Sequence, residues 1–251
     1  MSSSEYRLQP ILSQKKWFGF DLDDTLHEFR KASGQASQSV FEAIDDTYGL
    51  DIDRLKTTYQ QILRTATANA FTDGRTSTQY RRERFTRLLQ AHGIDDSGLG
   101  SDEAKPVDPL LDIYKSSLKS SLALKEHALP LLQTLQQLGK KVIVITEGPA
   151  DAQEWTVKEL GLWPYIDVLV TTNEVGRSKV DGLFKVMLER YGIAVDEIVY
   201  FGDNELRDIQ PAQEEGILAV LYDEKQQSRL EDSASLRVQS WEALLHVLDE
   251  E

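Results

Sequence analysis

Hydrophobic residues follow two different spacings along this chain. After residue 126, short runs of consecutive apolar residues, rich in valine and isoleucine, alternate with segments whose apolar residues recur every three or four positions. Runs of the first kind are typical of strands buried on both faces of a parallel sheet, and spacing of the second kind is typical of helices. In chain order, the pattern predicts helix Leu129–Leu138, strand Val142–Ile145, helix Asp151–Leu160, strand Asp167–Thr172, helix Val180–Tyr191, strand Glu197–Phe201, helix Asp208–Glu215, strand Ile217–Tyr222, a polar loop Asp223–Ser235 and a last helix around Trp241.

The stretch between residues 28 and 125 shows helical spacing alone. Breaks rich in glycine, aspartate, serine and proline divide it into successive segments. A strand-like run at Trp17–Phe20 precedes this stretch. We therefore expect an α/β fold in which a bundle of about four or five helices is inserted between the first strand and the rest of a parallel sheet. The expected boundaries are 1–27 and 126–251 for the sheet-containing core and 28–125 for the helical insertion.

Composition narrows the classes of protein that fit. The 251 residues carry a formal net charge of −14, and an acidic surface repels the phosphates of nucleic acids and of anionic lipids, so we expect neither partner. The absence of cysteine excludes disulfides, thiolate nucleophiles and cysteine-based metal sites. The N-terminal segment lacks the apolar core of a secretory signal, and no apolar run approaches the ~18 residues of a membrane span, so we expect a cytoplasmic protein.

Four polar signals follow strand-like runs along the chain. Ligands of open parallel sheets bind at the carboxyl ends of the strands, so side chains placed there are expected to meet at one edge. Together these side chains supply carboxylates, hydroxyls and an ammonium, the groups needed to hold a metal ion beside a phosphoryl group. In chain order, the signals are Asp21, Asp23 and Thr25 after the first run, Thr146 after the second, Lys179 after the third, and Asp203 with Asp208 after the fourth.

The four aspartates need a counter-charge if they converge. Two unit charges ~4 Å apart repel by about 4 kcal/mol at an effective dielectric near 20, and several such pairs cannot stay ionised alone. A divalent cation relieves this repulsion, and ligands that are all oxygen favour magnesium over zinc. Lys179 adds an ammonium and Thr146 a hydroxyl donor, while the turns after Phe20 and Thr146 offer backbone N–H groups to an anion.

This set of groups fits phosphoryl transfer. The chain has no cysteine, and no serine is placed beside a histidine base, so a carboxylate is the available nucleophile. A carboxylate can attack phosphorus to form an aspartyl-phosphate. A second aspartate can protonate the leaving alkoxide and later deprotonate water, while metal and lysine neutralise the charge that moves.

Taken together, the motifs resemble the four signature motifs of the haloacid dehalogenase superfamily. The matching segments are Phe-Asp-Leu-Asp-Asp-Thr-Leu at 20–26, the strand that ends in Thr146, Ser-Lys-Val-Asp-Gly-Leu-Phe at 178–184 and Gly-Asp-Asn-Glu-Leu-Arg-Asp at 202–208. The resemblance covers nearly the whole chain, because a helical cap inserted after the first motif is the superfamily's first cap type. It implies a Rossmann-like core and a mobile helical cap that closes over the substrate.

The resemblance also implies a role for each matching residue. Asp21 would be the nucleophile and Asp23 the general acid and base. Magnesium would be bound by Asp21, the Asp23 carbonyl oxygen and Asp203, with Asp208 as a further or water-mediated ligand. The implied phosphate-binding residues are Asp21, Leu22, Asp23, Thr146, Glu147 and Lys179.

One position departs from the family pattern. Many members carry a small or neutral residue after the threonine of the second motif, and this chain has Glu147 there, followed by Gly148. An anionic side chain beside a phosphate would weaken binding unless it turns away, although its backbone N–H could still serve.

Two other features have simpler interpretations. The basic cluster Arg81, Arg82, Arg84 and Arg87 is interpreted as a solvated helix face paired with Glu83 and other acids. His27, just beyond the first motif, is interpreted as a packing or hinge residue.

The function that follows is a magnesium-dependent phosphatase acting on a small soluble phosphomonoester. A halide leaves without protonation, so a carboxyl group at Asp23 has no role in dehalogenation. A phosphomutase and a non-catalytic regulatory or scaffold protein of the same fold remain as alternatives. The sequence leaves the individual substrate and the oligomeric state open.

Overall fold

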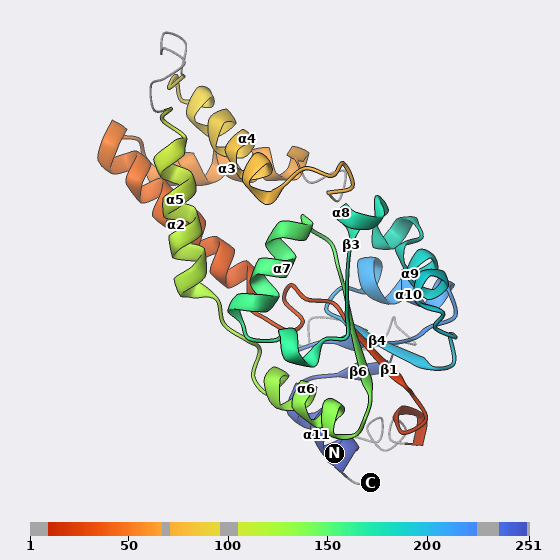
Figure 1. Ribbon diagram of the computed structural model, residues 1–251. Helices are drawn as coiled ribbons and strands as arrows, with labels where there is room; N and C mark the ends of the chain where they lie inside the picture. Colours follow the sequence, from red (N-terminus) through yellow and green to blue (C-terminus); the bar gives the residue numbers. More distant parts are fainter. Residues whose placement is uncertain (1–9, 67–70, 96–104, 225–235, 250–251) are drawn as a thin grey trace.

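The computed structural model describes residues 10–66, 71–95, 105–224 and 236–249. Its centre is a six-stranded parallel sheet with the order β3-β2-β1-β4-β5-β6 (Figure 1). The chain runs outward from β1 to one side and then crosses to the other, so the direction of winding changes beside β1, where such sheets bind ligands. The strands are β1 (Trp17–Phe20), β2 (Lys141–Thr146), β3 (Val168–Thr171), β4 (Ile198–Gly202), β5 (Leu218–Tyr222) and β6 (Leu236–Val238).

Both faces of the sheet are covered, which explains its continuous apolar strands. Alternate residues of β2 show this, because Val142 and Val144 belong to one buried cluster and Ile143 and Ile145 to another. The first cluster includes residues of α6 (Ala128–Gln137), α7 (Ala150–Glu159) and α11 (Trp241–Asp249). The second includes residues of α9 (Leu183–Tyr191) and α10 (Gln210–Glu214).

Four helices between β1 and α6 form a separate bundle, seen apart from the sheet at the upper left of Figure 1. They share a hydrophobic cluster of their own, centred on residues such as Phe41, Phe85 and Leu110. The helices are α2 (Phe29–Tyr48), α3 (Ile52–Ala66), α4 (Ser77–Ala91) and α5 (Asp108–Ser121). The predicted α/β fold with a parallel-sheet core and an inserted helical cap is therefore confirmed.

The two connections between core and cap lie side by side. The Glu28 N–H donates to the Ala123 carbonyl at 2.9 Å, and the Lys125 N–H donates to the Leu26 carbonyl at 2.9 Å. We propose these paired crossings as the domain boundaries, at residues 27/28 and 125/126.

Further contacts join the N-terminal end of α4 to the core. The Asp151 carboxylate of α7 accepts hydrogen bonds from the Ser77 backbone N–H at 2.9 Å and from the Ser77 hydroxyl at 2.8 Å. The Asn173 side-chain amide donates to the carbonyls of Phe71 and Arg75 at 3.1 and 3.2 Å. A capping box formed by Thr76 with Gln79 fixes the start of α4 itself. The first turn of α4 is therefore held against the core.

Several predicted elements differ in extent from the observed ones. The predicted helix Val180–Tyr191 begins only at Leu183, because Gly182 has a left-handed conformation with φ 83°. The predicted helix Asp208–Glu215 begins instead with a π-helical turn at Glu205–Ile209, which continues into α10. The three-residue β6 and the four-residue α8 (Thr172–Val175) were not predicted, since elements this short carry no periodic signal. Of the predicted loop Asp223–Ser235, residues 225–235 lie outside the described residues.

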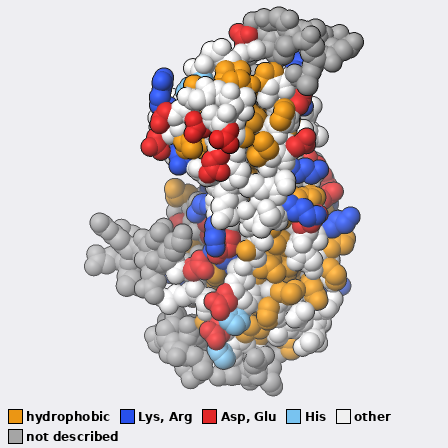
Figure 2. All heavy atoms as spheres, turned by 90° about the vertical axis from the view of Figure 1, so that its left-hand side faces the viewer, with side chains coloured by type: hydrophobic (Ala, Val, Ile, Leu, Met, Phe, Trp, Pro, Cys, Tyr) orange, Lys and Arg blue, Asp and Glu red, His pale blue; other side chains and the backbone are white. Residues whose placement is uncertain are grey.

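Charged side chains of both signs share the surface. On the face shown in Figure 2, acidic side chains lie close to basic ones over the upper, helical part of the molecule. Within the described ranges, no helix is both long enough and apolar enough to cross a membrane.

Candidate active site

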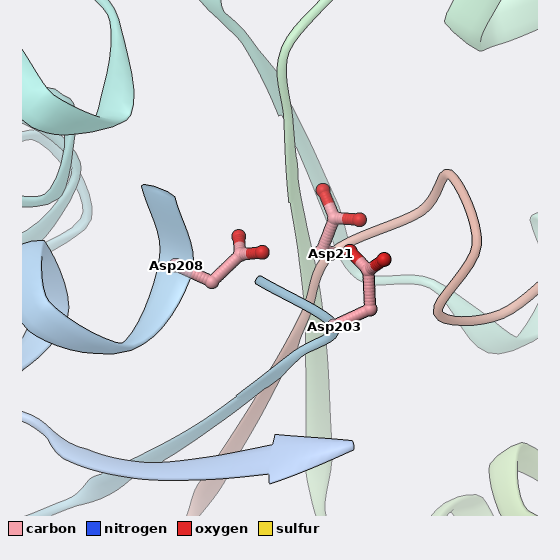
Figure 3. Close-up of side chains that lie close together, drawn as sticks. All are labelled: Asp21, Asp203 and Asp208. Carbon is pink, nitrogen blue, oxygen red and sulfur yellow. The ribbon is translucent and has the colours of Figure 1, made fainter. Parts of the chain in front are cut away.

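Three carboxylates converge at the carboxyl edge of the sheet. Asp21 directly follows β1, Asp203 directly follows the neighbouring β4, and Asp208 lies in the π-helical turn after β4. One carboxylate oxygen of each residue lies within 4.8 Å of one from each of the others. Figure 3 shows their carboxyl groups directed into the same space. The convergence expected for these aspartates is present in the fold.

Lys179 is the cation of this cluster. Its Nζ donates to Asp21 Oδ1 at 2.5 Å and to Asp208 Oδ1 at 2.6 Å, and its side chain is only 3% exposed. Burial alone would lower the pKa of Lys179, but the carboxylates of Asp208 and Asp21 outweigh it and raise the pKa above its ordinary value. Lys179 therefore stays protonated and holds the two carboxyl groups together.

The position of Asp208 depends on two further donors and on one small residue. Its Oδ1 also accepts from the Tyr200 hydroxyl at 2.9 Å, and its Oδ2 accepts from the Asn204 N–H at 3.1 Å. A Cβ atom on Gly202 would lie 2.5 Å from Asp208 Cβ, so only glycine allows the π-helical turn to approach β4 this closely. Most lone pairs of Asp208 are thus already used, which suits an orienting residue for Lys179.

The electrostatics of the cluster favour an added cation. Burial raises the pKa of Asp21 well above its ordinary value, with Lys179 opposing that rise and Asp208 adding to it. Burial and then Asp208 raise the pKa of Asp203 to about 6. Three carboxylates share one buried ammonium and, at Asp203, the exposed Arg30 guanidinium, and a divalent cation would offset the remaining negative charge. Because all of the donors are oxygens, this set fits magnesium.

Asp23 is not one of the three clustered carboxylates and lines a cavity beneath the helical cap. Its Oδ1 lies 2.8 Å from His27 Nε2, and its Oδ2 accepts from Gln153 Nε2 at 3.4 Å. His27 is fully buried and its Nδ1 has no hydrogen-bond partner among the described residues. The ring proton therefore belongs on Nε2, where it is donated to Asp23. The interpretation of His27 as a packing residue missed this contact.

The expected phosphate-binding residues differ in what they present. Thr146, at the end of β2, is fully buried, and its hydroxyl has no partner within the described part of the chain. The Leu22 side chain is buried in the core, so only its backbone can face a phosphate. An unpaired buried hydroxyl at a strand end is what an incoming phosphate oxygen would satisfy.

The Glu147 carboxylate is held away from this position. Its Oε1 accepts from the Lys179 backbone N–H at 2.9 Å, and its Oε2 accepts from Arg207 Nε at 2.6 Å. Both carboxylate oxygens are thus directed to the loops that follow β3 and β4. The departure from the family pattern at this position is therefore locally compensated.

Sequence reasoning missed contacts made by residues outside the motifs. Arg30, near the start of α2, donates from Nη2 to Asp203 Oδ2 at 3.1 Å, and its Nε lies 3.1 Å from Asp24 Oδ2. Tyr200, within β4, and Gln153, in the distant α7, also donate to the motif residues Asp208 and Asp23. None of these three carries a local sequence signal, because each depends on how separate elements pack.

Comparison with proteins of related sequence identifies the family of this chain. The model of the haloacid dehalogenase-like hydrolase family matches residues 15–216. A glyceraldehyde 3-phosphate phosphatase from Methanocaldococcus jannaschii is 28% identical over 205 residues, which cover 80% of this chain and 82% of that relative. A ribulose-1,5-bisphosphate 5-phosphatase from Halopiger xanaduensis is 27% identical over 217 residues, covering 86% of this chain and 87% of that relative.

Solved structures of similar fold extend over almost the whole molecule. The magnesium-bound HAD-hydrolase YfnB from Bacillus subtilis has a TM-score of 0.70 at 22% identity, covering 94% of this chain and 99% of that one. A 2-haloacid dehalogenase from Pseudomonas syringae has a TM-score of 0.68 at 23% identity, with the same coverage. At this identity the two structures support the fold alone. With the family model matched over most of its length, the chain belongs to the haloacid dehalogenase-like hydrolase family.

Proposed function

We propose that this protein is a magnesium-dependent phosphatase that hydrolyses a small phosphorylated metabolite in the cytoplasm through an aspartyl-phosphate. The observation that carries the proposal is the Asp21 carboxylate, which is buried, paired with Lys179 at 2.5 Å and adjacent to Asp203 and Asp208. Such a carboxylate is fixed in position and surrounded by groups that tolerate a transferred phosphoryl charge.

In the first half-reaction, an Asp21 oxygen attacks phosphorus and the P–O bond to the leaving group breaks. Protonated Asp23, which lines the cavity, gives its proton to the leaving alkoxide. In the second half-reaction, Asp23 takes a proton from water, the water oxygen attacks phosphorus, and the bond to Asp21 breaks to release inorganic phosphate. His27 and Gln153 keep the Asp23 carboxyl group directed at the cavity throughout.

The remaining residues hold charge in place. Lys179 and the Thr146 hydroxyl would contact phosphoryl oxygens, with the backbone N–H groups of Leu22, Asp23 and Glu147. Asp21, Asp203 and the Asp23 carbonyl would hold the magnesium ion, with Asp208 as a further or water-mediated ligand. Bound there, the ion would neutralise the carboxylates and the phosphoryl oxygens.

The curated relatives support the choice of a phosphatase. Those reported above are named for phosphomonoester substrates. A third relative of the same kind, phosphoserine phosphatase from Thermus thermophilus, is 30% identical over 93 residues, which is 37% of this chain. No residue that the reaction requires is missing from the described site, which counts against a non-catalytic scaffold.

Phosphate release across a panel of natural phosphomonoesters, with Mg²⁺ and with a chelator, tests the proposal. We expect turnover with Mg²⁺ and loss of turnover with the chelator. Asp21→Asn removes the nucleophile and should lower turnover by at least about a thousandfold, while the circular dichroism spectrum stays unchanged. Wild-type rates in Asp21→Asn would refute the assignment of the nucleophile. No metal-dependent release from any compound would favour the scaffold instead.

A further inference from the structure

A cavity of about 330 Å³ lies between the helical cap and the core. Its walls come from all four cap helices, from the loop after β2 and from α7, and Asp23 places it beside the proposed catalytic edge. The volume is at the small end of ligand-binding pockets, so it suits a small metabolite rather than a polymer. The contacts of Ser77 with Asp151 hold the first turn of α4 against α7 at this cavity.

Two arginines of α4, Arg81 and Arg84, are the cations among the described lining residues. Arg84 Nε and Nη2 are buried and have no hydrogen-bond partner within the described chain. The Arg84 guanidinium lies 5.7 Å from the centre of the Phe71 ring and 5.9 Å from that of the Tyr80 ring. Aromatic faces attract a cation weakly, but they offer no acceptor to these two N–H groups.

Neighbouring arginines of the same helix behave in the ordinary way. Arg82 Nη1 donates to Asp108 at 2.6 Å, and Arg87 lies 3.8 Å from Glu83. The interpretation of this cluster as a solvated, paired helix face is therefore correct for Arg82 and Arg87. It is wrong for Arg81 and Arg84, because the packing of α4 turns that side of the helix toward the cavity.

The acidic residues of the lining do not neutralise Arg84. Asp23 is engaged by His27 and Gln153, and Glu147 is engaged by Arg207 and the Lys179 backbone. In a chain with 42 acidic against 28 basic residues, a guanidinium that pairs with none of the described carboxylates is unusual. A buried polar group without a partner is costly, and a guanidinium stays charged, so the free protein bears that cost until a ligand supplies acceptors.

A second observation concerns Arg81, which lines the same cavity as Arg84. Arg81 lies over the Tyr114 ring, 5.0 Å from its centre. Arg81, Arg84 and Asp23 all line this cavity, so the two arginines and the proposed general acid border one shared space.

We infer that Arg84, supported by Arg81, binds a second anionic group at the far end of the substrate. The substrate class is then a small phosphomonoester that also carries a carboxylate or a second phosphate, since the planar guanidinium fork matches either group bidentately. This inference rests on the proposed function, because it places the cleaved phosphate at Asp21 and the second anion under α4.

Three phosphate esters on one three-carbon skeleton provide the test. Glycerol phosphate has a neutral far end, phosphoglycerate a carboxylate, and glycerol bisphosphate a second phosphate. We expect the wild type to prefer at least one anionic compound over glycerol phosphate by about tenfold or more in kcat/KM, as a charge-assisted hydrogen bond provides. Whichever of the two is preferred identifies the anionic group.

The variants assign the preference to the arginine. Arg84→Met should lower the preference for the anionic compound over glycerol phosphate by about tenfold or more. Arg84→Lys keeps the charge but lacks the planar guanidinium, so it should retain part of this preference. Arg82→Met is the matched control on the same helix and should leave the preference unchanged. Arg84→Met should also raise the melting temperature of the ligand-free protein, because it removes two buried guanidinium nitrogen atoms that have no partner among the described residues. A structural role for Arg84 predicts a lower melting temperature instead.

Thermal shifts with the same three compounds, in buffer without Mg²⁺, report binding without chemistry. Larger stabilisation of the wild type by an anionic compound, lost in Arg84→Met, would support the anion site even where none of the compounds is hydrolysed. If neither these compounds nor any other phosphomonoester is hydrolysed, the result would count against the proposed phosphatase activity but not against the anion site at Arg84. Equal wild-type preference for all three compounds in both assays, or a preference that Arg84→Met retains, would overturn the inference.

Discussion

The sheet edge and the cap cavity both contain basic side chains, but Lys179 at the edge is paired with carboxylates, whereas Arg84 in the cavity has two N–H groups without a partner among the described residues. At the edge, Lys179 contacts Asp21 and Asp208, and Asp208 accepts donors at both carboxylate oxygens. In the cavity, two nitrogen atoms of Arg84 are buried without a partner among the described residues. The paired side chains at the edge are held in position before the substrate binds. The Arg84 guanidinium has N–H groups that an anionic group of the substrate can satisfy. The difference separates a site for chemistry from a site for recognition.

Among tests of this difference, the largest expected effect on turnover comes from Asp23, which follows β1 at the sheet edge and also lines the cavity. Asp23→Asn removes the proposed proton donor and should slow esters with poor leaving groups by about 10²–10⁴-fold. Aryl phosphates, whose leaving groups need little protonation, should lose less, and the preference for a second anion should persist. Steady-state kinetics on matched alkyl and aryl phosphates measure this. Equal losses on both would argue against Asp23 as the acid.

Lys179→Met breaks the matched charges at the sheet edge. It leaves Asp21 and Asp208 buried without their ammonium, which should lower the free energy of unfolding by about 3–5 kcal/mol. Turnover should fall by about 10²–10³-fold, as when one stabilising donor is removed. Urea unfolding and kinetics report the two effects, and Lys185→Met, at an exposed position of α9, is the control. A Lys179→Met variant as stable as the wild type would show that the Lys179 ammonium does not stabilise the buried Asp21 and Asp208 carboxylates.

Asp203→Asn should produce a smaller effect whose sign depends on pH and metal. Burial raises the pKa of Asp203 to about 6 from the ordinary 3.8, so the folded protein binds more protons than the unfolded chain between these values. Stability without metal therefore falls as the pH rises through this window. Asp203→Asn removes the carboxylate charge, so at about pH 7.5 its free energy of unfolding should exceed that of the wild type by about 1–2 kcal/mol. This figure is reduced from the full effect of the pKa shift because Asp203 is partly exposed.

Two conditions test the origin of that gain. The difference should shrink as the pH falls and vanish only well below 3.8, where Asp203 is protonated in both the folded and the unfolded state. With Mg²⁺ the order should reverse, since only the wild type retains the full set of metal ligands. Asp46→Asn, at an exposed position of α2, is the control and should show neither effect. A gain that is constant with pH would contradict the assigned cause.

The smallest effect concerns Glu147. Arg207→Ala frees the Glu147 carboxylate to turn toward the phosphate site, and KM should rise by up to about fivefold, since exposed ion pairs contribute ~1 kcal/mol or less. Glu147→Gln in the same background should restore KM, because it removes the repelling charge. An unchanged KM in Arg207→Ala would mean that the Lys179 N–H alone holds Glu147 away.

The sequence predicted the sheet edge far better than the cavity, for a physical reason. Asp21 and Asp203 directly follow strands whose carboxyl ends must share an edge once the sheet is parallel, so strand order and local spacing bring them together. Lys179, by the same logic, was expected near them and lies 2.5 Å from Asp21. Position after a strand is information that the local sequence contains.

The cavity has no such local code. Arg84 and Arg82 lie on one helix two positions apart, and which of them faces the cavity depends on how α4 packs against the other cap helices and the core. The same limit applies to Gln153, whose partner Asp23 lies 130 positions away in the sequence. Within the core, β6 was missed because three residues, Leu236–Val238, are too few for a period to show.

The most direct test of the account is rapid-quench trapping of the intermediate on Asp21. Wild-type and Asp23→Asn protein, mixed with Mg²⁺ and the best substrate, would be quenched in acid at millisecond times and the peptides analysed by mass spectrometry. The account predicts an acid-stable, hydroxylamine-sensitive phosphate on the peptide containing Asp21 before free phosphate accumulates, and slower loss of that phosphate in Asp23→Asn. Steady turnover with no phosphate on the protein at any time, or phosphate on a different residue, would contradict it.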